Sequence, residues 1–475
     1  MTAFLSTSDY LNLPNSFYKS VVPTAAINPK YTIFNKKLSN DLDLDYDYMT
    51  SQKGLDILSG KNTENLSPFS QAYMGHQFGH LTMLGDGRAI LLGQINQQNE
   101  LQLKGSGHTP FSRSGDGMAT IGPMIREYIF SEAMYNLNIP TTRILAVIET
   151  GRQIMRKDLE TGALAARITS SHLRVGTFQY AHLNTNYTDL KALSDYAINK
   201  HYSHLKQTEA PYLSLFKTVI KRQAELIANW QLIGFIHGVM NTDNMTISGE
   251  TIDYGPCAFM DVFKPNQVFS SIDLHGRYAY NQQPNIGGWN LARLAESLLP
   301  LFSNDEQEAL FLAETELKKY TQLFEHYFHA GLLKKIGLTT LSTKNINFAE
   351  ELLRIMAHEE RDFTETFRAL TRQDTVYLDL TRSNNFKEWY DKWLKLISSN
   401  FENAVNQMKK VNPAVIPRNY LVEEAILQIE TTGKQEKLQA LLALIKNPFD
   451  YNEIQLNYTF PESEKNRDFK TYCGT

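Results

Sequence analysis

The pattern of hydrophobic positions divides the chain into a strand-rich first part and a helix-rich second part. Short apolar runs occupy residues 84–106, where AILLGQI (89–95), a polar tip at 96–99 and the alternating segment ELQLKG predict a β-hairpin. Residues 144–149 and 163–169 are typical of two further strands around a turn at Gly151. After about residue 185 helical spacing takes over, beginning with residues 213–233.

Two helix starts carry recognisable signals. Apolar residues recur every four positions between Gly122-Pro123 and Pro140, so we expect an amphipathic helix that begins at the first proline and ends before the second. Ser303 followed by Glu306 has the spacing of a capping box and predicts the start of a later helix.

These patterns predict an α+β protein with a strand-rich N-terminal lobe and a larger helical C-terminal lobe. Residues 1–60 are mixed polar and interrupted by prolines, and we interpret them as an extension laid over the folded body. Residues 61–182 are then expected to form the N-lobe, and residues 183–475 the helical C-lobe with a tail. A cleft between two unlike lobes is the natural place for a ligand.

Composition excludes several classes of function. With 47 Lys+Arg against 51 Asp+Glu, the net charge of −4 leaves no broad cationic field for a nucleic acid. No stretch approaches the roughly 18 uncharged apolar residues of a membrane span, and no secretory or transit signal is evident. The only cysteines, Cys257 and Cys473, fit a reducing compartment. We therefore expect a monomeric cytoplasmic protein with no nucleic-acid or membrane partner.

Three weak signals in the strand-rich part become informative through their order. Gly85 and Gly87 flank Asp86 before a strand, where missing side chains let backbone N–H groups approach a nucleotide, although this is also a common turn. Lys104 ends the hairpin, and Glu127 lies in the first turns of the next helix. The separation of 23 residues between Lys104 and Glu127 is compatible with an ion pair that aims the lysine ammonium at phosphates. Each of the two residues alone is more often an ordinary surface residue.

The segment HGVMNTDNMTISGETIDYG has a catalytic-loop pattern. Kinase-like loops follow H-x-D-x-x-x-x-N, with a base at the third position, a metal-binding Asn at the eighth and a metal-binding Asp in a later D-[FY]-G. His237 and Asn244 keep this spacing and Asp253 begins D-Y-G, but the third position is Val239, which cannot accept a proton. Asp243 is the remaining local carboxylate. The oxygen donors of Asn244 and Asp253 suit Mg²⁺ or Mn²⁺ bridging the phosphates of a nucleotide.

Two further segments supply candidates for phosphate binding. GSGHTPFSRSGDGMATIG follows Lys104 and contains Asp116 and Gly117. We expect it to bring backbone donors and a carboxylate into the cleft, with a flexible linker as the alternative. ARITSSHLRVGTFQ contains Arg167 and Arg174, whose planar guanidinium groups suit bidentate phosphate binding, with ion pairs at the surface as the alternative.

The order of LGDGRA, QLKGSGHTPFSRSGDG, IREYIFSEAM, ARITSSHLRVGTFQ, HGVMNTDNM and DYGP closely resembles the selenoprotein O (SelO/YdiU) family over nearly the whole chain. The resemblance implies a protein-kinase-like bilobal fold of the pseudokinase type. It also implies transfer of AMP from ATP to Ser, Thr or Tyr hydroxyls of proteins, with release of pyrophosphate and with the nucleotide reversed relative to kinases. UTP in place of ATP stays open.

The resemblance further implies roles for individual residues. Asp243 would be the general base, Asn244 and Asp253 would hold Mg²⁺ or Mn²⁺, and Glu127 would orient Lys104. The residues implied to hold ATP, with Asp253 among them, are Gly85, Gly87, Arg88, Lys104, Asp116, Gly117, Arg167 and Arg174.

Two questions stay open at this point. Family members often carry a cysteine or selenocysteine near the C-terminus that can pair with an internal cysteine, which here implies Cys473 and Cys257, with a buried inert Cys257 as the alternative. The function also has two alternatives: a phosphotransferase that uses Asp243 in an unusual loop, and a non-catalytic nucleotide-binding scaffold, which Val239 at the usual base position motivates.

Overall fold

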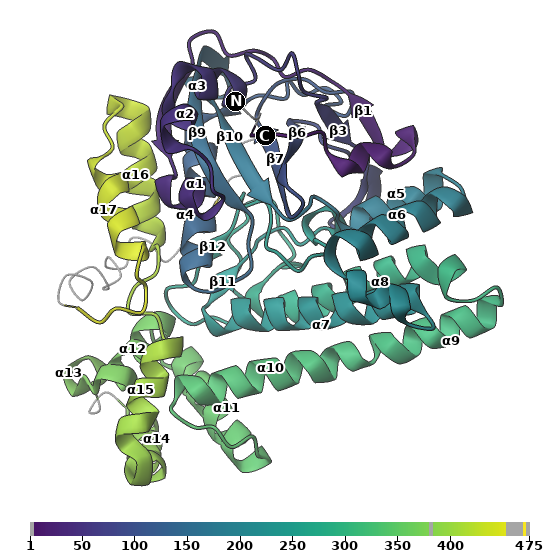
Figure 1. The fold of residues 1–475 in the computed structure, drawn as a ribbon. Helices are drawn as coiled ribbons and strands as arrows, with labels where there is room; N and C mark the ends of the chain where they lie inside the picture. The colour runs from purple at the N-terminus through teal and green to yellow at the C-terminus, as the bar shows by residue number, and fades with distance from the viewer. Residues whose placement is uncertain (1–3, 380–382, 453–468, 472–475) are drawn as a thin grey trace.

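The computed structural model describes residues 4–379, 383–452 and 469–471, and it is an α+β protein (Figure 1). A twisted eight-stranded sheet lies in the upper part of the view, and most of the long helices lie below it. Strands from the first 60 residues occupy both edges of this sheet, and all its pairings are antiparallel. In spatial order the strands are β1 (Tyr18–Ser20), β3 (Phe69–Gln71), β6 (Ala89–Asn96), β7 (Asn99–Lys104), β10 (Leu159–Thr169), β9 (Arg143–Met155) and β2 (Lys30–Phe34), and β8 (Ala119–Thr120) also pairs with β10.

The strand predictions are confirmed except for one turn. Strands β6 and β7 form the expected hairpin, in which Ala89 pairs with Lys104. The predicted turn at Gly151 is wrong, because β9 continues through it and the chain reverses at residues 156–158. Gly151 has φ +74°, and a side chain there would lie 2.7 Å from the backbone nitrogen of Asn28. This glycine therefore permits close approach of the N-terminal segment within a strand.

The helix expected between the two prolines is confirmed as α4 (Ile121–Asn136), with Pro123 in its first turn. Its predicted amphipathic character is wrong, because residues 121–134 are buried except for Pro123. Strands β9 and β10 cover one side of α4, and α16 (Asn419–Thr432) covers another. A helix that is covered on all sides has no reason to keep a polar face.

The helical part begins with α7 (Pro211–Leu232), which confirms the helix expected over residues 213–233. It runs beside α10 (Lys319–Lys335) below the sheet (Figure 1). The predicted capping box is wrong: Ser303 follows the last residue of α8 (Gln283–Phe302). The cap of α9 (Glu306–Leu317) is Asp305, whose carboxylate accepts the backbone N–H of Glu308 at 2.8 Å. Aspartate serves as well as serine at this position, so the local sequence offered two candidates.

The last long helices return to the sheet. Helices α16 and α17 (Glu436–Ile445) stand beside α4, and the side chain of Gln435 donates to the carbonyl of Thr32 in β2 at 3.0 Å (Figure 1). The remaining helices are α1 (Lys36–Asp41), α2 (Tyr46–Thr50), α3 (Gln52–Leu58), α5 (Val175–Asn184), α6 (Tyr187–His201), α11 (Thr343–His358), α12 (Phe363–Arg372), α13 (Thr375–Leu378), α14 (Asn384–Ile397) and α15 (Phe401–Val411). Two short two-stranded sheets complete the fold, β4 (Met74–Gln77) with β5 (His80–Met83), and β11 (Phe235–Ile236) with β12 (Ala258–Phe259).

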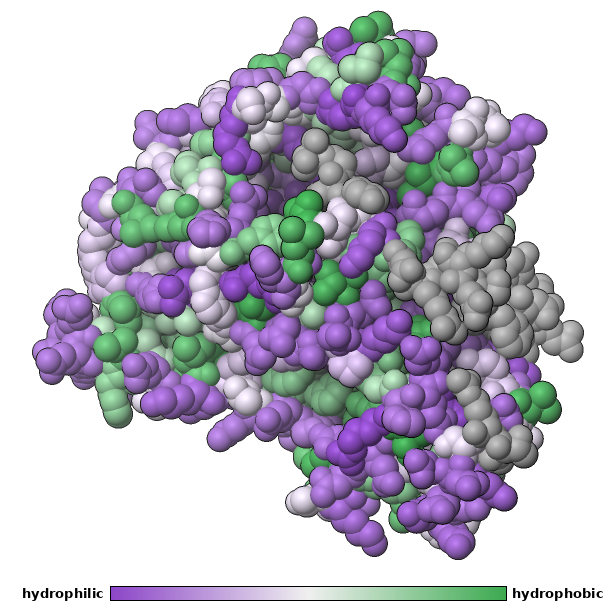
Figure 2. Space-filling model, turned by 180° about the vertical axis from the view of Figure 1, so that it is seen from behind, coloured by the Kyte–Doolittle hydropathy of each residue, from purple (hydrophilic) through white to green (hydrophobic). Residues whose placement is uncertain are grey.

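Hydrophobic residues on the face shown in Figure 2 form scattered patches among hydrophilic ones. Within the described ranges, no helix combines the length and the apolar character that crossing a bilayer requires.

Candidate active site

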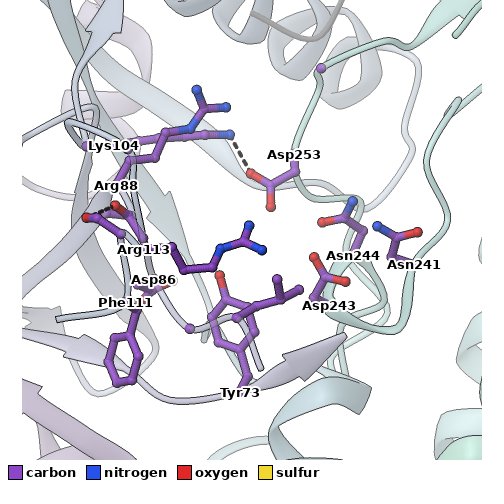
Figure 3. A pocket seen from close by; sticks show the side chains of 18 of the residues that line it. Tyr73, Asp86, Arg88, Lys104, Phe111, Arg113, Asn241, Asp243, Asn244 and Asp253 are labelled. Carbon is purple, nitrogen blue, oxygen red and sulfur yellow. Dashed lines mark hydrogen bonds and ion pairs between the residues drawn. The ribbon is translucent and has the colours of Figure 1, made fainter. Parts of the chain in front are cut away.

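A cavity of about 480 Å³ lies between the sheet and the loops that follow α7. In Figure 3, Lys104, Arg88 and Phe111 stand on one side of this cavity, and Asp243, Asn244 and Asn241 stand on the other. The structure thus brings together residues that the sequence singled out from distant segments. Those lining the cavity are Gly85, Gly87, Arg88, Lys104, Asp116, Gly117, Arg167, Arg174, Asp243, Asn244 and Asp253.

A buried cluster of ion pairs occupies one end of the cavity. Lys104 Nζ lies 2.7 Å from Glu127 Oε2 and also bonds to Asp253 Oδ1, so the expected pairing of Lys104 and Glu127 is present. Arg167 Nη1 lies 2.7 Å from the same Asp253 oxygen and 3.3 Å from Glu127 Oε1. The side chains of Lys104 and Arg167 are only 8% and 1% exposed. Their burial excludes the alternative of a solvated lysine and a surface arginine.

Asp253 has both a shifted pKa and an uncommon backbone conformation in this cluster. Burial by itself would raise the pKa of its carboxyl, but the positive charges of Lys104, Arg167 and Arg174 together lower that pKa well below its usual range. Its φ of +64° lies in the left-handed region, which few residues other than glycine adopt. Such a conformation persists only where its surroundings enforce it, and it often marks a functional site.

Arg174 is positioned at the N-terminus of α5 by three groups. Its guanidinium donates to the carbonyl of His172 at 3.0 Å and lies 3.6 Å from Asp86 Oδ1. The same guanidinium stacks 4.3 Å from the centre of the Tyr73 ring. Burial raises the pKa of the Asp86 carboxyl, and the charge of Arg174 opposes this rise. Arg174 is therefore a buried cation whose position is set by its surroundings.

Asp86 also organises the glycine-containing turn around it. Its Oδ2 accepts hydrogen bonds from the backbone of Gln71 and the side chain of Gln102, both at 3.1 Å. The hydroxyl of Thr109 donates to the backbone carbonyl of Asp86 at 2.7 Å. Gly85 has φ +75°, and a side chain there would overlap the ring of Phe111. The turn is thus packed closely against the segment that follows Lys104.

That following segment is folded back on itself and on the sheet. The backbone N–H of Gly107 donates to the carbonyl of Gly117 at 3.0 Å, and Ser112 donates to the carbonyl of Gly87. Asp116 forms a bidentate pair with Arg156, at 2.8 and 3.0 Å. The hydrogen bonds from Arg156 lower the pKa of the Asp116 carboxyl. These contacts contradict the alternative of a flexible linker. Asp116 lines the cavity, but its carboxylate is paired with Arg156.

Asp243 and Asn244 lie on a short 3₁₀ turn (Thr242–Asn244) at the opposite wall. Asp243 Oδ1 is buried and has no hydrogen-bond partner among the described residues. Burial raises the pKa of this carboxyl to about 7, Asp253 adds to the rise, and Arg174 opposes it. A carboxyl with a pKa near neutrality and a vacant acceptor atom can take a proton from a bound hydroxyl.

Asn244 and Asp253 form a donor set that fits a divalent cation. The Asn244 Nδ2 group donates to the carbonyl of Val239 at 3.0 Å, which leaves the amide oxygen for another ligand. Both cations that bond to Asp253 use Oδ1, so its Oδ2 is also available. Mg²⁺ and Mn²⁺ prefer oxygen ligands, and with nucleotides they are held by one or two protein groups plus phosphate oxygens.

Sequence reasoning missed several cavity residues, among them Asp86, Asn241 and Tyr73. Asp86 and Asn241 lie inside the motifs LGDGRA and HGVMNTDN, so the motifs themselves could have pointed to them. Tyr73 has no local signal, because it reaches Arg174 only through the fold. His237, which begins the catalytic-loop pattern, lies in the core, where its Nε2 contacts the carbonyl of Ile252 at 2.9 Å.

Cys257 does not line the cavity described above. Cys257 is fully buried, and its carbonyl accepts a hydrogen bond from Arg126 at 2.6 Å. Cys473 lies outside the described residues. The hydroxyl of Thr471 donates to the carbonyl of Pro256 at 2.8 Å, so the C-terminal segment does approach Cys257. The pairing of Cys257 with Cys473 stays a prediction.

Comparison with known proteins identifies the family of the chain. A family model described as "Protein adenylyltransferase SelO" matches residues 2–446. "Protein nucleotidyltransferase YdiU" of Clostridium botulinum (strain Eklund 17B / Type B) is 47% identical, with 98% of this chain and 96% of the relative covered. The protein of the same name from Bacillus mycoides (strain KBAB4) is 48% identical, with 98% of each chain covered. The chain therefore belongs to the SelO family and is an enzyme of the protein nucleotidyltransferase class.

Proposed function

We propose that this enzyme transfers AMP from ATP to Ser, Thr or Tyr hydroxyls of proteins. The observation that carries the proposal is that three buried cations, Lys104, Arg167 and Arg174, line one cavity together with Asp243. Three cations suit the two terminal phosphates of a nucleotide that enters tail-first. The α-phosphorus then faces the wall that carries Asp243.

In this orientation each residue has a definite task. The acceptor hydroxyl attacks the α-phosphorus, its proton passes to the Asp243 carboxylate, and the bond from the α-phosphorus to the bridging oxygen of the β-phosphate breaks. Pyrophosphate leaves with the bonding electrons and is stabilised by Lys104, Arg167 and Arg174. Glu127 holds Lys104 in place. The turn at Gly85 and Gly87 does not supply the backbone donors expected from the sequence, because the N–H of Gly85 donates to the carbonyl of Tyr73 and the N–H of Gly87 donates to the carbonyl of Gly85.

We further propose that Asn244 and Asp253 hold Mg²⁺ or Mn²⁺. When bound, the cation would neutralise charge that develops between the α- and β-phosphates. The order of Lys104, Glu127, Asn244 and Asp253 along the chain supports a kinase-like division into an N-lobe (61–182) and a C-lobe (183–475). Monomeric state, cytoplasmic location and the choice between ATP and UTP stay predictions.

Separate labelling of the α- and γ-phosphates of ATP tests the proposed reaction. AMP transfer predicts that label reaches protein only from the α position, together with release of one pyrophosphate per label. Protein labelled only from the γ position would instead establish the phosphotransferase. If neither label is transferred while ATP still binds, the non-catalytic scaffold is supported.

A further inference from the structure

A second groove, of about 660 Å³, lies next to the active-site cavity. It runs between the tip of the β4–β5 hairpin and the loop that precedes α8. Its walls combine apolar side chains with two basic ones. Among the residues that line this groove are Phe78, Ile272, Leu274, His275, Arg277 and Ile286, and Asp273 also borders it.

The hairpin forms a thin wall between the two cavities. Gln77 lines the active-site cavity, whereas its neighbour Phe78 lines the groove. On the active-site side of this wall, a side chain at Gly75 would overlap the carboxylate of Asp243. Phe78 follows β4 (Met74–Gln77) in the turn of the hairpin, with φ +50°, so the same hairpin borders both the proposed base and the groove.

A chain of hydrogen bonds connects the groove to the active site. The backbone N–H of Phe78 donates to the hydroxyl of Tyr278 at 3.1 Å. That hydroxyl donates in turn to Asn241 Oδ1 at 2.6 Å, and Asn241 lines the active-site cavity. A polypeptide in the groove would therefore lie beside the catalytic loop rather than at a remote surface.

The groove exposes apolar side chains that its own fold does not cover. Leu274 is 83% exposed and Ile272 is 55% exposed, whereas Phe78 and Ile286 are more buried. Single exposed leucines need no explanation, but two on the rim of a groove that adjoins an active site are typical of an interaction surface.

The groove also presents a positive charge. Asp273 is the nearest acidic neighbour in sequence, but its two oxygens accept the backbone N–H groups of Arg277 and Tyr278, at 2.9 and 2.8 Å. The Arg277 guanidinium instead stacks on Trp289, 4.8 Å from the ring centre, and no ion pair involves it within the described ranges. Its Nε is buried without a hydrogen-bond partner among the same residues. The Arg277 side chain is partly exposed and also interacts with the Tyr278 hydroxyl. Its positive charge has no carboxylate partner among the described residues and can pair with an external carboxylate.

We propose that this groove binds the acceptor protein, through an extended segment that carries an apolar side chain and a carboxylate near the modified hydroxyl. The apolar side chain packs against Ile272 and Leu274, and the carboxylate pairs with Arg277. The acceptor hydroxyl then reaches Asp243 along the hairpin wall. This inference rests on the proposed transfer to proteins and adds the chemistry by which acceptors are chosen.

Two sets of short synthetic peptides test the proposal, each with one central Ser, Thr or Tyr flanked by Leu and by either Glu or Lys. Peptide affinity is measured by fluorescence anisotropy, and AMP transfer by label from α-labelled ATP. Wild-type enzyme should bind the Glu peptides about tenfold more tightly than the Lys peptides, and Arg277→Glu should reverse this preference. Equal affinities of wild-type enzyme for the two sets would overturn the proposal.

Leu274→Asp tests the apolar contact and has a matched control in Leu427→Asp, since Leu427 is 59% exposed on the distant helix α16. Leu274→Asp should weaken peptide binding about tenfold or more while ATP affinity and thermal stability stay unchanged, and Leu427→Asp should change none of these. If Leu274→Asp alters the sedimentation of the enzyme but not its peptide affinity, the groove is an interface between copies and the proposal is wrong.

Because anisotropy needs no catalysis, tight peptide binding without labelling would refute AMP transfer and leave the groove assignment intact.

Discussion

Two buried clusters of arginine and carboxylates differ in what surrounds them. In the active site, Asp253 bonds to Lys104 and Arg167, and its side chain is 25% exposed to the cavity. In the helical part, Asp362 forms a bidentate pair with Arg418, at 2.7 and 3.1 Å, and its side chain is only 4% exposed. One carboxylate can exchange partners through the cavity, whereas the other is enclosed.

The two clusters also differ in the pKa of their carboxyl groups. Three cations lower the pKa of Asp253 despite its burial. Burial instead raises the pKa of Asp362, and raises that of its neighbour Glu365 to about 7, although Arg418 opposes both shifts. A buried ion pair is therefore not by itself a sign of catalysis. The cluster that we propose as functional is the one in which the cations outweigh desolvation and border a cavity.

Removing the proposed base should have the largest effect on activity. Asp243→Asn keeps the size of the side chain but cannot accept the proton, so we expect AMP transfer to fall roughly 10²–10⁴-fold. ATP affinity with Mg²⁺ present should stay close to that of wild type, as measured by calorimetric titration. Full transfer activity in this variant would show that Asp243 is not the base.

Removing the cation of the enclosed cluster should mainly affect stability. Arg418→Met leaves the acidic side chains around Asp362 buried without their partner, which should lower the free energy of unfolding by about 3–5 kcal/mol. Urea unfolding measures this loss, and Arg418→Lys should lose less. If Arg418→Met unfolded at the wild-type urea concentration, the contrast between the two clusters would fail.

Removing a cation of the active-site cluster should mainly affect the nucleotide. Arg167→Gln loses a charged hydrogen bond to a terminal phosphate, so ATP affinity should fall by about 10–100-fold, whereas AMP affinity should change little. The ratio of the two dissociation constants tests the tail-first orientation. Equal losses for ATP and AMP would contradict it.

Another buried cation, Lys335, sharpens the comparison because it has no carboxylate partner among the described residues. Lys335 packs on the ring of Phe367, 4.2 Å from its centre, and burial lowers the pKa of its ammonium to about 7. Between pH 7 and about 10.5 the lysine is protonated in the unfolded chain but neutral in the folded one, so folding must release a proton. The cost of this release grows as the pH falls, and Lys335 therefore destabilises the fold most at or below neutral pH.

Lys335→Met should therefore raise the free energy of unfolding by about 1–4 kcal/mol at pH 7 and by less at about pH 10. Urea unfolding at the two pH values measures the difference, with Lys434→Met, an exposed lysine after α16, as the control. A gain that is the same at both pH values would mean that Lys335 stays charged in the fold.

Local sequence was sufficient to predict an element where one local pattern determines its structure. The hairpin of β6 and β7 followed from alternation and its polar tip, and α4 followed from its periodicity and prolines. The turn at Gly151 and the cap at Ser303 were predicted wrongly because glycine and serine serve several local structures. Which of these structures forms is decided by distant partners, such as Asn28 beside Gly151.

The sequence by itself determined the residue types of the candidate site and their order along the chain, and so the family. Only the tertiary structure decided that Lys104, Glu127, Arg167 and Asp253 share one ion cluster, that Tyr73 stacks on Arg174, and that one hairpin borders both Asp243 and the groove at Leu274. The physical reason is that charge and burial act through space. A residue's pKa and partners depend on neighbours that the chain brings together only by folding.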